Sequence, residues 1–323
     1  MIDLLRNTER AARALWRCRR GLETLERSFY SRMVLPQICQ VPALVFPRME
    51  VDVICLVGEA GAEMAIWTAR SLDYFSERNW QHVWIDDGTL SPRTLSRAAR
   101  ALPGLRVVSL PEGDALLARS LGGYPACRRA VAHHPIFRRA FLLSEVMRGD
   151  RCVSVDSDVL FFARPREMLE WASAPVGEAR FMFDPINFYF PKFEILSEWH
   201  GRPVIKHVNG GLVMQPAGGL DLDLTERLLS AFWEAPGRSW HIEQSILALQ
   251  MTRLGGRALS EEYEVSFHPE RRPYCVARHY VSAGPVRNYF LTEGIALLCR
   301  FLLTRSDPSG ALRPSPQSIL LNS

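Results

Sequence analysis

An apolar strand that ends in two aspartates constrains this chain more than any other feature. Residues 153–162 read Val-Ser-Val-Asp-Ser-Asp-Val-Leu-Phe-Phe, which places Asp156 and Asp158 two positions apart in an extended segment. Side chains at that spacing point to the same side of an extended chain. The flanking apolar residues would hold both carboxylates at the edge of a core. Such a pair is suited to a hard divalent cation, which can in turn hold a diphosphate.

Strand-like and helix-like segments alternate on both sides of this signature. The pattern predicts an α/β fold, with a mostly parallel, doubly wound central sheet flanked by helices. Ligands of such sheets bind beyond the carboxyl ends of the strands, where Gly58, Asp86 and Asp156 fall. We predict strands over residues 51–58, 81–85, 105–110, 151–156, 180–183, 205–214 and 275–281, and helices over 60–75, 92–102, 135–147, 222–233, 242–254 and 287–303.

The composition divides the chain into three regions. Residues 1–50 combine an amphipathic helix, to about residue 30, with a proline-punctuated linker. Residues 51–305 form the main domain, and residues 306–323 are rich in Pro, Ser, Gly and Asn, which predicts a disordered, flexible tail. One side of the N-terminal helix is arginine-rich. We favour a helix packed on the domain with a solvated basic face, and the alternative is a peripheral contact with an anionic membrane.

Charge and cysteine content narrow the functional class. The net charge of +4 is mild, so no nucleic-acid partner is expected. The seven cysteines are odd in number and contain no CxxC pair, which favours a reducing compartment over a disulfide framework. No signal peptide and no run of roughly 18 apolar residues is visible. We therefore expect a cytoplasmic protein that is at most peripheral to a membrane.

Two later motifs carry polar groups in strand and helix contexts. Asn209, Gly210 and Gly211 interrupt an apolar strand, where glycines mark a bulge or a close backbone approach, and Asn209 has hydrogen-bonding groups for a polyol. A plain turn is the alternative. Glu243 and Gln244 open a predicted helix. They would either place a carboxylate and an amide at the reacting carbon or stabilise the helix dipole.

A third motif contains a late histidine. His279 leaves a predicted strand toward a glycine turn at Gly284, with the cationic Arg287 close by. A lone histidine is usually structural. This context suits a third metal ligand with a phosphate contact beside it.

In this order the four elements resemble the metal-dependent glycosyltransferases of the GT-A fold, over about residues 51–290. The nearest match is the retaining group that includes glycogenin and bacterial lipopolysaccharide galactosyltransferases. The resemblance implies that Mn²⁺ (or Mg²⁺) is bound by Asp156, Asp158 and His279 on a nucleotide-sugar diphosphate. It also implies three catalytic candidates, Asn209, Glu243 and Gln244. The donor-binding candidates are Gly58, Asp86, Arg138, Arg139, Ser157, Gly210, Gly211, Gly284 and Arg287.

The chain departs from the family pattern at several of these positions. An aspartate usually stands where Glu243 is found, and a further acidic residue where Ser245 is found. Gly284 and Arg287 are the nearest equivalents of a family glycine and lysine. Arginine grips phosphate as well as lysine does. Asp86 (or its neighbour in the chain) either reads the base or ribose of the nucleotide or belongs to a simple turn.

The expected activity is transfer of a sugar, by resemblance from a UDP-sugar, to an acceptor hydroxyl on a glycan, a lipid-linked sugar or a small molecule. Retention of configuration is implied by the resemblance alone. If Glu243 lay near the acceptor hydroxyl, it could instead act as a general base, and the configuration would invert. One alternative is a sugar-1-phosphate nucleotidyltransferase, which needs a cation in the loop after the first strand, whereas residues 58–62 have none. The other is a catalytically silent binding module of the same fold.

Overall fold

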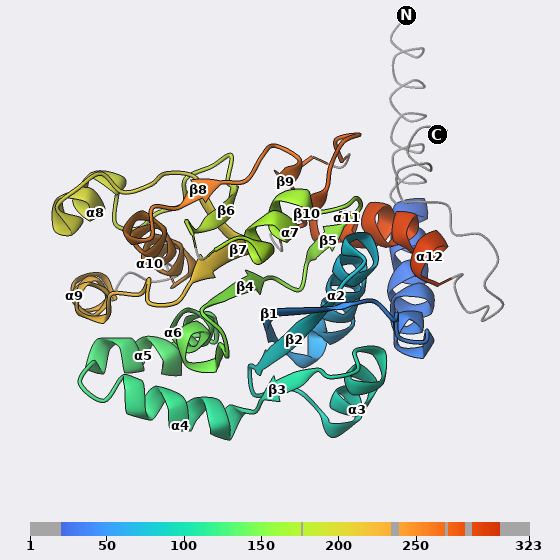
Figure 1. The fold of residues 1–323 in the computed structure, drawn as a ribbon, viewed down its shortest axis with the longest axis horizontal. Coiled ribbons are helices and arrows are strands. Elements are labelled where there is room, and N and C mark those ends of the chain that lie inside the picture. The colour runs from blue at the N-terminus through green and yellow to red at the C-terminus, as the bar shows by residue number, and fades with distance from the viewer. Residues whose placement is uncertain (1–20, 176, 234–238, 269–270, 282–285, 304–323) are drawn as a thin grey trace, which may run out of the picture.

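The protein is built around a seven-stranded sheet with helices on both faces, as the computed structural model shows (Figure 1). The structure describes residues 21–175, 177–233, 239–268, 271–281 and 286–303. The strand order is β3-β2-β1-β4-β7-β6-β8, and within this sheet of the described residues β7 alone runs against its neighbours. This confirms the predicted mostly parallel sheet. The strands are β1 (Arg48–Val57), β2 (Asn79–Asp86), β3 (Arg106–Val108), β4 (Arg151–Val155), β6 (Arg180–Phe183), β7 (Val208–Pro216) and β8 (Arg257–Ala258).

The central strand β1 shows how the sequence builds two cores. Val53 and Cys55 pack into one apolar cluster, and Ile54 between them packs into the other, because successive side chains of a strand point to opposite faces. Each cluster is closed by its own helices. The first contains α2 (Ala62–Ser76), α3 (Pro92–Ala101), α7 (Arg166–Ser173), α11 (Val286–Tyr289) and α12 (Ala296–Leu302); the second contains α4 (Leu110–Ser120), α5 (Pro125–His133), α6 (Ile136–Val146), α8 (Phe193–His200), α9 (Leu222–Phe232) and α10 (Ser239–Arg253).

A second, three-stranded sheet lies beside the first, in the order β5-β10-β9 (Figure 1). Its strands are β5 (Val159–Phe161), β9 (Tyr263–Val265) and β10 (Ala277–His279). Strand β10 runs antiparallel to β5 and parallel to β9. Because β5 begins directly after Asp158, this small sheet brings a strand from late in the chain to the end of β4.

Several boundaries follow the predicted signals closely. The Ser91 side chain accepts a hydrogen bond from the backbone N–H of Thr94 at 3.2 Å and caps α3, which begins at Pro92 as predicted. Strand β1 starts at Arg48, three residues before the expected domain boundary at residue 51.

The predicted strand over residues 105–110 is wrong at its end. β3 stops at Val108, Ser109 caps the next helix by accepting from the N–H of Glu112, and α4 begins at Leu110. The helices α4, α5, α7 and α8 were not predicted. In α4 and α5 a proline stands at the start, where its missing N–H costs nothing, so a residue that reads as loop punctuation marks a helix N-terminus instead.

The two ends of the described chain pack together (Figure 1). Residues 21–29 are helical, continue into a π-helical segment at Tyr30–Val34, and are tied to α11 by a 3.1 Å hydrogen bond from Arg27 to Asn288. The predicted last helix comprises α11, a π-helical segment (Phe290–Ile295) and α12. The first 20 residues of the predicted N-terminal helix and the predicted tail, 306–323, lie outside the described residues. No helix in the described part of the chain is long and apolar enough to span a membrane.

Candidate metal and donor site

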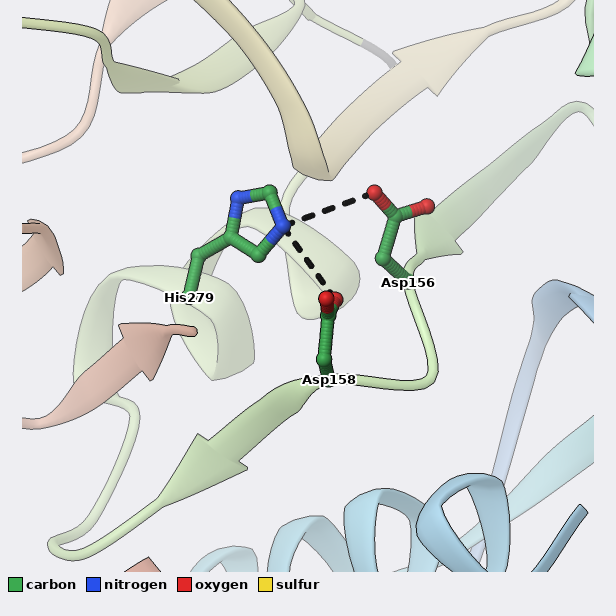
Figure 2. Close-up of side chains that lie close together, drawn as sticks. All are labelled: Asp156, Asp158 and His279. Carbon is green, nitrogen blue, oxygen red and sulfur yellow. Dashed lines mark ion pairs between the residues drawn. The ribbon is translucent and has the colours of Figure 1, made fainter. Parts of the chain in front are cut away.

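Three side chains from two sheets converge at the carboxyl end of β4. Figure 2 shows Asp156, Asp158 and His279 pointing toward one another. The Nε2 atom of His279 lies 3.2 Å from an oxygen of Asp158 and 3.6 Å from an oxygen of Asp156. One candidate ligand atom from each residue falls within 4.8 Å of the other two. The three predicted metal ligands therefore meet.

The backbone fixes this meeting point. In the β5–β10 ladder His279 stands opposite Val159, and the N–H of Tyr280 donates to the carbonyl of Asp158 at 2.9 Å. The N–H of Asp156 donates to the carbonyl of Gly211 at 2.8 Å. A Cβ added at Gly211 would lie 2.2 Å from Nδ1 of His279. The glycine is required by a close approach of the imidazole, which is one of the two reasons that the sequence offered for it.

Asn209 orients the imidazole. Its side-chain oxygen lies 2.7 Å from Nδ1 of His279 and also accepts from the N–H of Gly211 at 2.9 Å. An amide oxygen is an acceptor only, so the proton of a neutral His279 belongs on Nδ1, and the lone pair of Nε2 faces the two carboxylates. A hydrogen bond of this kind to the far nitrogen is typical of metal-binding histidines.

The carboxylates also set the charge state of His279. Burial opposes protonation of the imidazole, but Asp158 and then Asp156 outweigh it and raise the pKa of His279. Without a cation, the imidazole keeps its proton to a higher pH than an ordinary histidine does. A divalent ion would replace that proton as the balancing charge.

Arg139 holds the acidic groups on the other side. From α6 its guanidinium contacts Asp156, donates to Glu243 at 3.0 Å and reaches the carbonyl of Gly210 at 3.4 Å. A Cβ at Gly210 would lie 3.0 Å from this guanidinium. Burial opposes the charged form, yet the Asp156 and Glu243 carboxylates raise the pKa of Arg139. The arginine is therefore a fixed positive charge beneath the site.

Arg138 faces elsewhere, although it is the next residue on the same helix. Its guanidinium donates to Asp114 at 2.6 Å and to the carbonyl of Leu110 at 3.3 Å. The sequence left open which of the two arginines meets the donor. The structure brings Arg139 to Asp156 and directs Arg138 toward α4.

Glu243 and Gln244 lie on α10, and both are buried. Burial raises the pKa of Glu243, against the pull of Arg139. The amide nitrogen of Gln244 donates to Asp184 at 3.2 Å and to the carbonyl of Val208 at 2.9 Å. Asp184 also accepts from Asn209 at 2.9 Å.

Asp184 was missed by the sequence reasoning. It is 3% exposed and joins the two candidate residues Asn209 and Gln244 through one carboxylate. A signal was available, because Asp184 directly follows the correctly predicted strand Arg180–Phe183, as Asp156 follows β4. An aspartate at the carboxyl end of a strand is a candidate wherever that strand joins the central sheet.

The ends of β1 and β2 meet beside this site. A Cβ added at Gly58 would lie 2.1 Å from a carboxylate oxygen of Asp87, so a larger residue there would have to displace that carboxylate. The Asp86 carboxylate accepts from two backbone N–H groups of its own turn, at 2.8 and 3.3 Å. That contact matches the turn alternative, and recognition of a nucleotide by Asp86 stays a prediction.

The remaining candidates are placed in part. The carbonyl of Ser157 accepts from Thr68 of α2 at 2.8 Å, and its hydroxyl would lie 3.4 Å from a Cβ built at Gly61. Ser157 thus faces the start of the helix that follows β1. Gly284 lies outside the described residues. Arg287 belongs to α11, and its side chain also lies outside them.

Comparisons with known proteins give a likeness of fold. No family model matches the chain, and no curated protein matches it. Among solved structures, the bifunctional glycosyltransferase WbbM gives a TM-score of 0.47 at 14% identity over 79% of this chain, which spans 51% of that protein, about half its length. Galactosyltransferase LgtC, solved with donor and acceptor sugar analogues, gives 0.47 at 14% identity, over 83% of this chain and 99% of that one. Mouse xyloside xylosyltransferase 1 gives 0.44 at 12% identity, over 72% and 98%. Each of these three proteins is named as a glycosyltransferase.

Proposed function

We propose that this protein is a metal-dependent glycosyltransferase of the GT-A type, which moves a sugar from a nucleotide-diphosphate donor to an acceptor hydroxyl. The observation that carries the proposal is the convergence of Asp156, Asp158 and His279. The backbone of β5 and β10 brings these three side chains together, and one candidate ligand atom from each lies within 4.8 Å of the other two. A bound cation is the best explanation for two carboxylates and an imidazole that meet at one point.

The donor set fits a divalent ion such as Mn²⁺. Two carboxylates and one imidazole suit Mn²⁺ better than Mg²⁺, which prefers all-oxygen ligands. Asn209 presets the tautomer that leaves Nε2 of His279 available, and Gly211 makes room for the ring. The bound ion would supply Lewis-acid stabilisation of the departing diphosphate.

The residues on the sugar side favour retention. We assign Glu243 to the anomeric carbon: it is buried and paired with Arg139 at 3.0 Å, and a carboxylate there would stabilise the positive charge that develops during transfer. The acceptor oxygen bonds to that carbon while the bond to the phosphate oxygen breaks with its electron pair. The acceptor proton passes to the leaving nucleoside diphosphate. We propose a UDP-sugar as donor, with Gln244 and Asn209 orienting the sugar.

The loop after β1 argues against a nucleotidyltransferase. Glu59 stands in that loop, and its carboxylate accepts from the N–H of Ser91 at 2.8 Å and from the hydroxyl of Thr94 at 2.6 Å. An acidic group at this position repels a triphosphate. A silent binding module would have no use for three intact ligands held within reach of one ion.

We also propose a peripheral contact of the N-terminal helix with an anionic membrane. Leu22, Leu25, Phe29 and Met33 follow helical spacing and are 55–68% exposed. The first 32 residues hold eight arginines and four acidic residues, a surplus equal to the net charge of +4 of the whole chain. Apolar surface beside arginines is typical of helices that lie in a lipid headgroup layer. We expect the protein to cosediment with phosphatidylglycerol vesicles but not with phosphatidylcholine vesicles, and we expect Phe29→Glu to abolish this cosedimentation. Equal cosedimentation with both kinds of vesicle would contradict the proposal.

The deciding experiment is incubation with a panel of UDP-sugars and Mn²⁺. We expect release of UDP that stops on chelation of the metal and returns when Mn²⁺ is restored. Pyrophosphate formation from UTP and a sugar-1-phosphate would instead support the nucleotidyltransferase. Silence across UDP-, GDP- and TDP-sugars would support the binding module.

A further inference from the structure

A helical segment late in the chain packs against the two strands that deliver the proposed metal ligands. It is the π-helical segment Phe290–Ile295, which lies between α11 and α12 (Figure 1). The rings of Phe290 and Tyr280 pack edge to face, with their centroids 5.6 Å apart. A Cβ added at Gly294 would lie 2.5 Å from Cδ1 of Leu160 in β5 and 2.9 Å from the hydroxyl oxygen of Tyr280, directly after β10. The segment is therefore in close contact with both strands.

Glu293 of this segment contacts both chain neighbours of His279. Because successive side chains of a strand point to opposite faces, Arg278 and Tyr280 lie on the face away from the imidazole. The Tyr280 hydroxyl donates to the Glu293 carboxylate, and a guanidinium nitrogen of Arg278 lies 3.6 Å from the same carboxylate. Arg271 adds a contact at 3.2 Å. One carboxylate thus holds the strand on both sides of His279.

The charges of Glu293 and Arg278 depend on each other. Burial raises the pKa of Glu293, while the Tyr280 hydroxyl and the neighbouring arginines lower it. The side chain of Arg278 is fully buried, lies over the Tyr280 ring at 4.8 Å from its centroid, and donates to the carbonyl of His268. A charge taken out of water needs a partner of opposite charge. Loss of the Glu293 charge would therefore disturb Arg278, and the backbone that it shares with His279.

We propose that Glu293 is a positioning residue for the metal site, which fixes β10 so that the imidazole of His279 stays within reach of Asp156 and Asp158. The inference rests on the proposed function, in which His279 is a metal ligand. Asn209 orients the ring through Nδ1 at 2.7 Å. Glu293 acts on a different quantity, because it holds the backbone from which the ring projects.

Calorimetric titration with Mn²⁺ tests the inference, with Glu293→Gln set against Glu63→Gln. Glu63 is a matched control, because its side chain is 28% exposed, against 24% for Glu293, and it also pairs with an arginine. That arginine, Arg97, lies on α3, so the pair joins α2 to α3. We expect Glu293→Gln to weaken Mn²⁺ binding roughly tenfold, and Glu63→Gln to leave it unchanged. Equal affinities in the two variants would overturn the inference.

Pulsed electron paramagnetic resonance of bound Mn²⁺ distinguishes positioning from a general loss of stability. At saturating Mn²⁺ the unmodified protein and Glu63→Gln should show coupling of the ion to the ¹⁴N nucleus of His279. We expect this coupling to weaken in Glu293→Gln, because the imidazole is no longer held at the ion. A variant that was only less stable would keep the full coupling in its folded molecules, and that result would contradict the inference.

Tyr280→Phe carries the test if Glu293→Gln does not fold. It removes one hydroxyl from the Glu293 contacts and keeps the ring that packs against Phe290. Mn²⁺ affinity should fall in this variant also, by a smaller factor than in Glu293→Gln. An affinity equal to that of the unmodified protein would overturn the inference.

The unmodified protein separates the two proposals. Its Mn²⁺ binding and its metal-dependent UDP release test the proposed function alone. If both are present and the variants at Glu293 and Tyr280 behave like Glu63→Gln, the positioning inference fails and the proposed function stands. If the unmodified protein neither binds Mn²⁺ nor releases UDP from any donor, both fail.

Discussion

Arg138 and Arg139 are neighbours on one helix and are almost equally buried, yet the regions that they contact differ in charge balance. Around Arg139 lie the carboxylates of Asp156 and Glu243, with Asp158 and Asp184 close behind. The region around Arg138 pairs its arginine with Asp114 and holds two acids and two arginines in all. The difference in charge indicates which of the two regions needs a cation. The first region carries more negative charge than its own residues neutralise, and the second is complete without an ion.

Removing a metal ligand should give the largest effect. Asp158→Asn leaves the shape of the site almost intact but removes a charged ligand, and we expect a loss of roughly a thousandfold in UDP release, which corresponds to about 4 kcal/mol. The matched change in the other region is Asp114→Asn. It should cost less than about tenfold in UDP release, because its arginine keeps a carbonyl partner.

Thermal melting with and without Mn²⁺ checks the same contrast. The unmodified protein and Asp114→Asn should melt at a higher temperature with Mn²⁺, since an ion that binds only the folded state stabilises it. Asp158→Asn should show almost no increase. A similar increase in all three would place the ion elsewhere.

The two arginines provide the second contrast. Arg139→Ala leaves two buried carboxylates without their partner, and we expect a loss of about 3–5 kcal/mol in the free energy of unfolding, measured by urea denaturation. Arg139→Lys should restore part of the stability but lower UDP release about a hundredfold, because lysine cannot hold two carboxylates in one plane. Arg138→Lys should leave Mn²⁺ affinity unchanged. A drop in Mn²⁺ affinity for Arg138→Lys would mean that the two regions are not separate.

Two adjacent glycines sharpen the comparison within the first region. Gly211→Ala pushes a methyl group into His279, so we expect Mn²⁺ affinity to fall roughly 10–100-fold in calorimetric titration. Gly210→Ala meets the end of a flexible arginine at 3.0 Å and should have a smaller effect on Mn²⁺ affinity. If Gly210→Ala weakened Mn²⁺ binding more than Gly211→Ala did, His279 would not be the critical ligand.

The pH dependence of Mn²⁺ binding should give the smallest effect. The raised pKa of His279 means that the metal-free protein keeps its proton to a higher pH than an ordinary histidine. Mn²⁺ has to displace that proton, so its affinity should fall as the pH is lowered through this pKa, by at most about tenfold for each pH unit. Titrations in buffers of different ionisation enthalpy would reveal the released proton. An affinity that is constant between about pH 8 and pH 6 would contradict this reading.

The sequence predicted the metal region far better than the region of α4 and α5. Asp156 ends one predicted strand and His279 lies in another, and the resemblance to the GT-A glycosyltransferases joined both in one ligand set. The pairing of β5 with β10 brings the acidic residues and His279 together. Strands of three residues are too short to show a sequence pattern from which this pairing could be predicted. Asp184 escaped because a single aspartate after a strand is common.

The surface cavity lined by α4, α5 and α6 could not be predicted, because only α6 of these three helices was. Pro111 and Pro125 stand at the starts of α4 and α5, and the segment between β3 and α6 read as a loop. A cavity also depends on how far apart three helices pack, which no residue in them encodes by itself. The choice between Arg138 and Arg139 was open for a similar reason, since neighbours on a helix differ by about 100° in direction.

One consequence follows from the position of β10. The imidazole comes from residue 279, whereas the two acids are synthesised more than a hundred residues earlier. During translation, both acids are present in the nascent chain long before all three proposed ligands are available to bind an ion. Under the proposed function, activity therefore awaits the arrival of the late strand, because a polypeptide cut short before that strand lacks the third ligand.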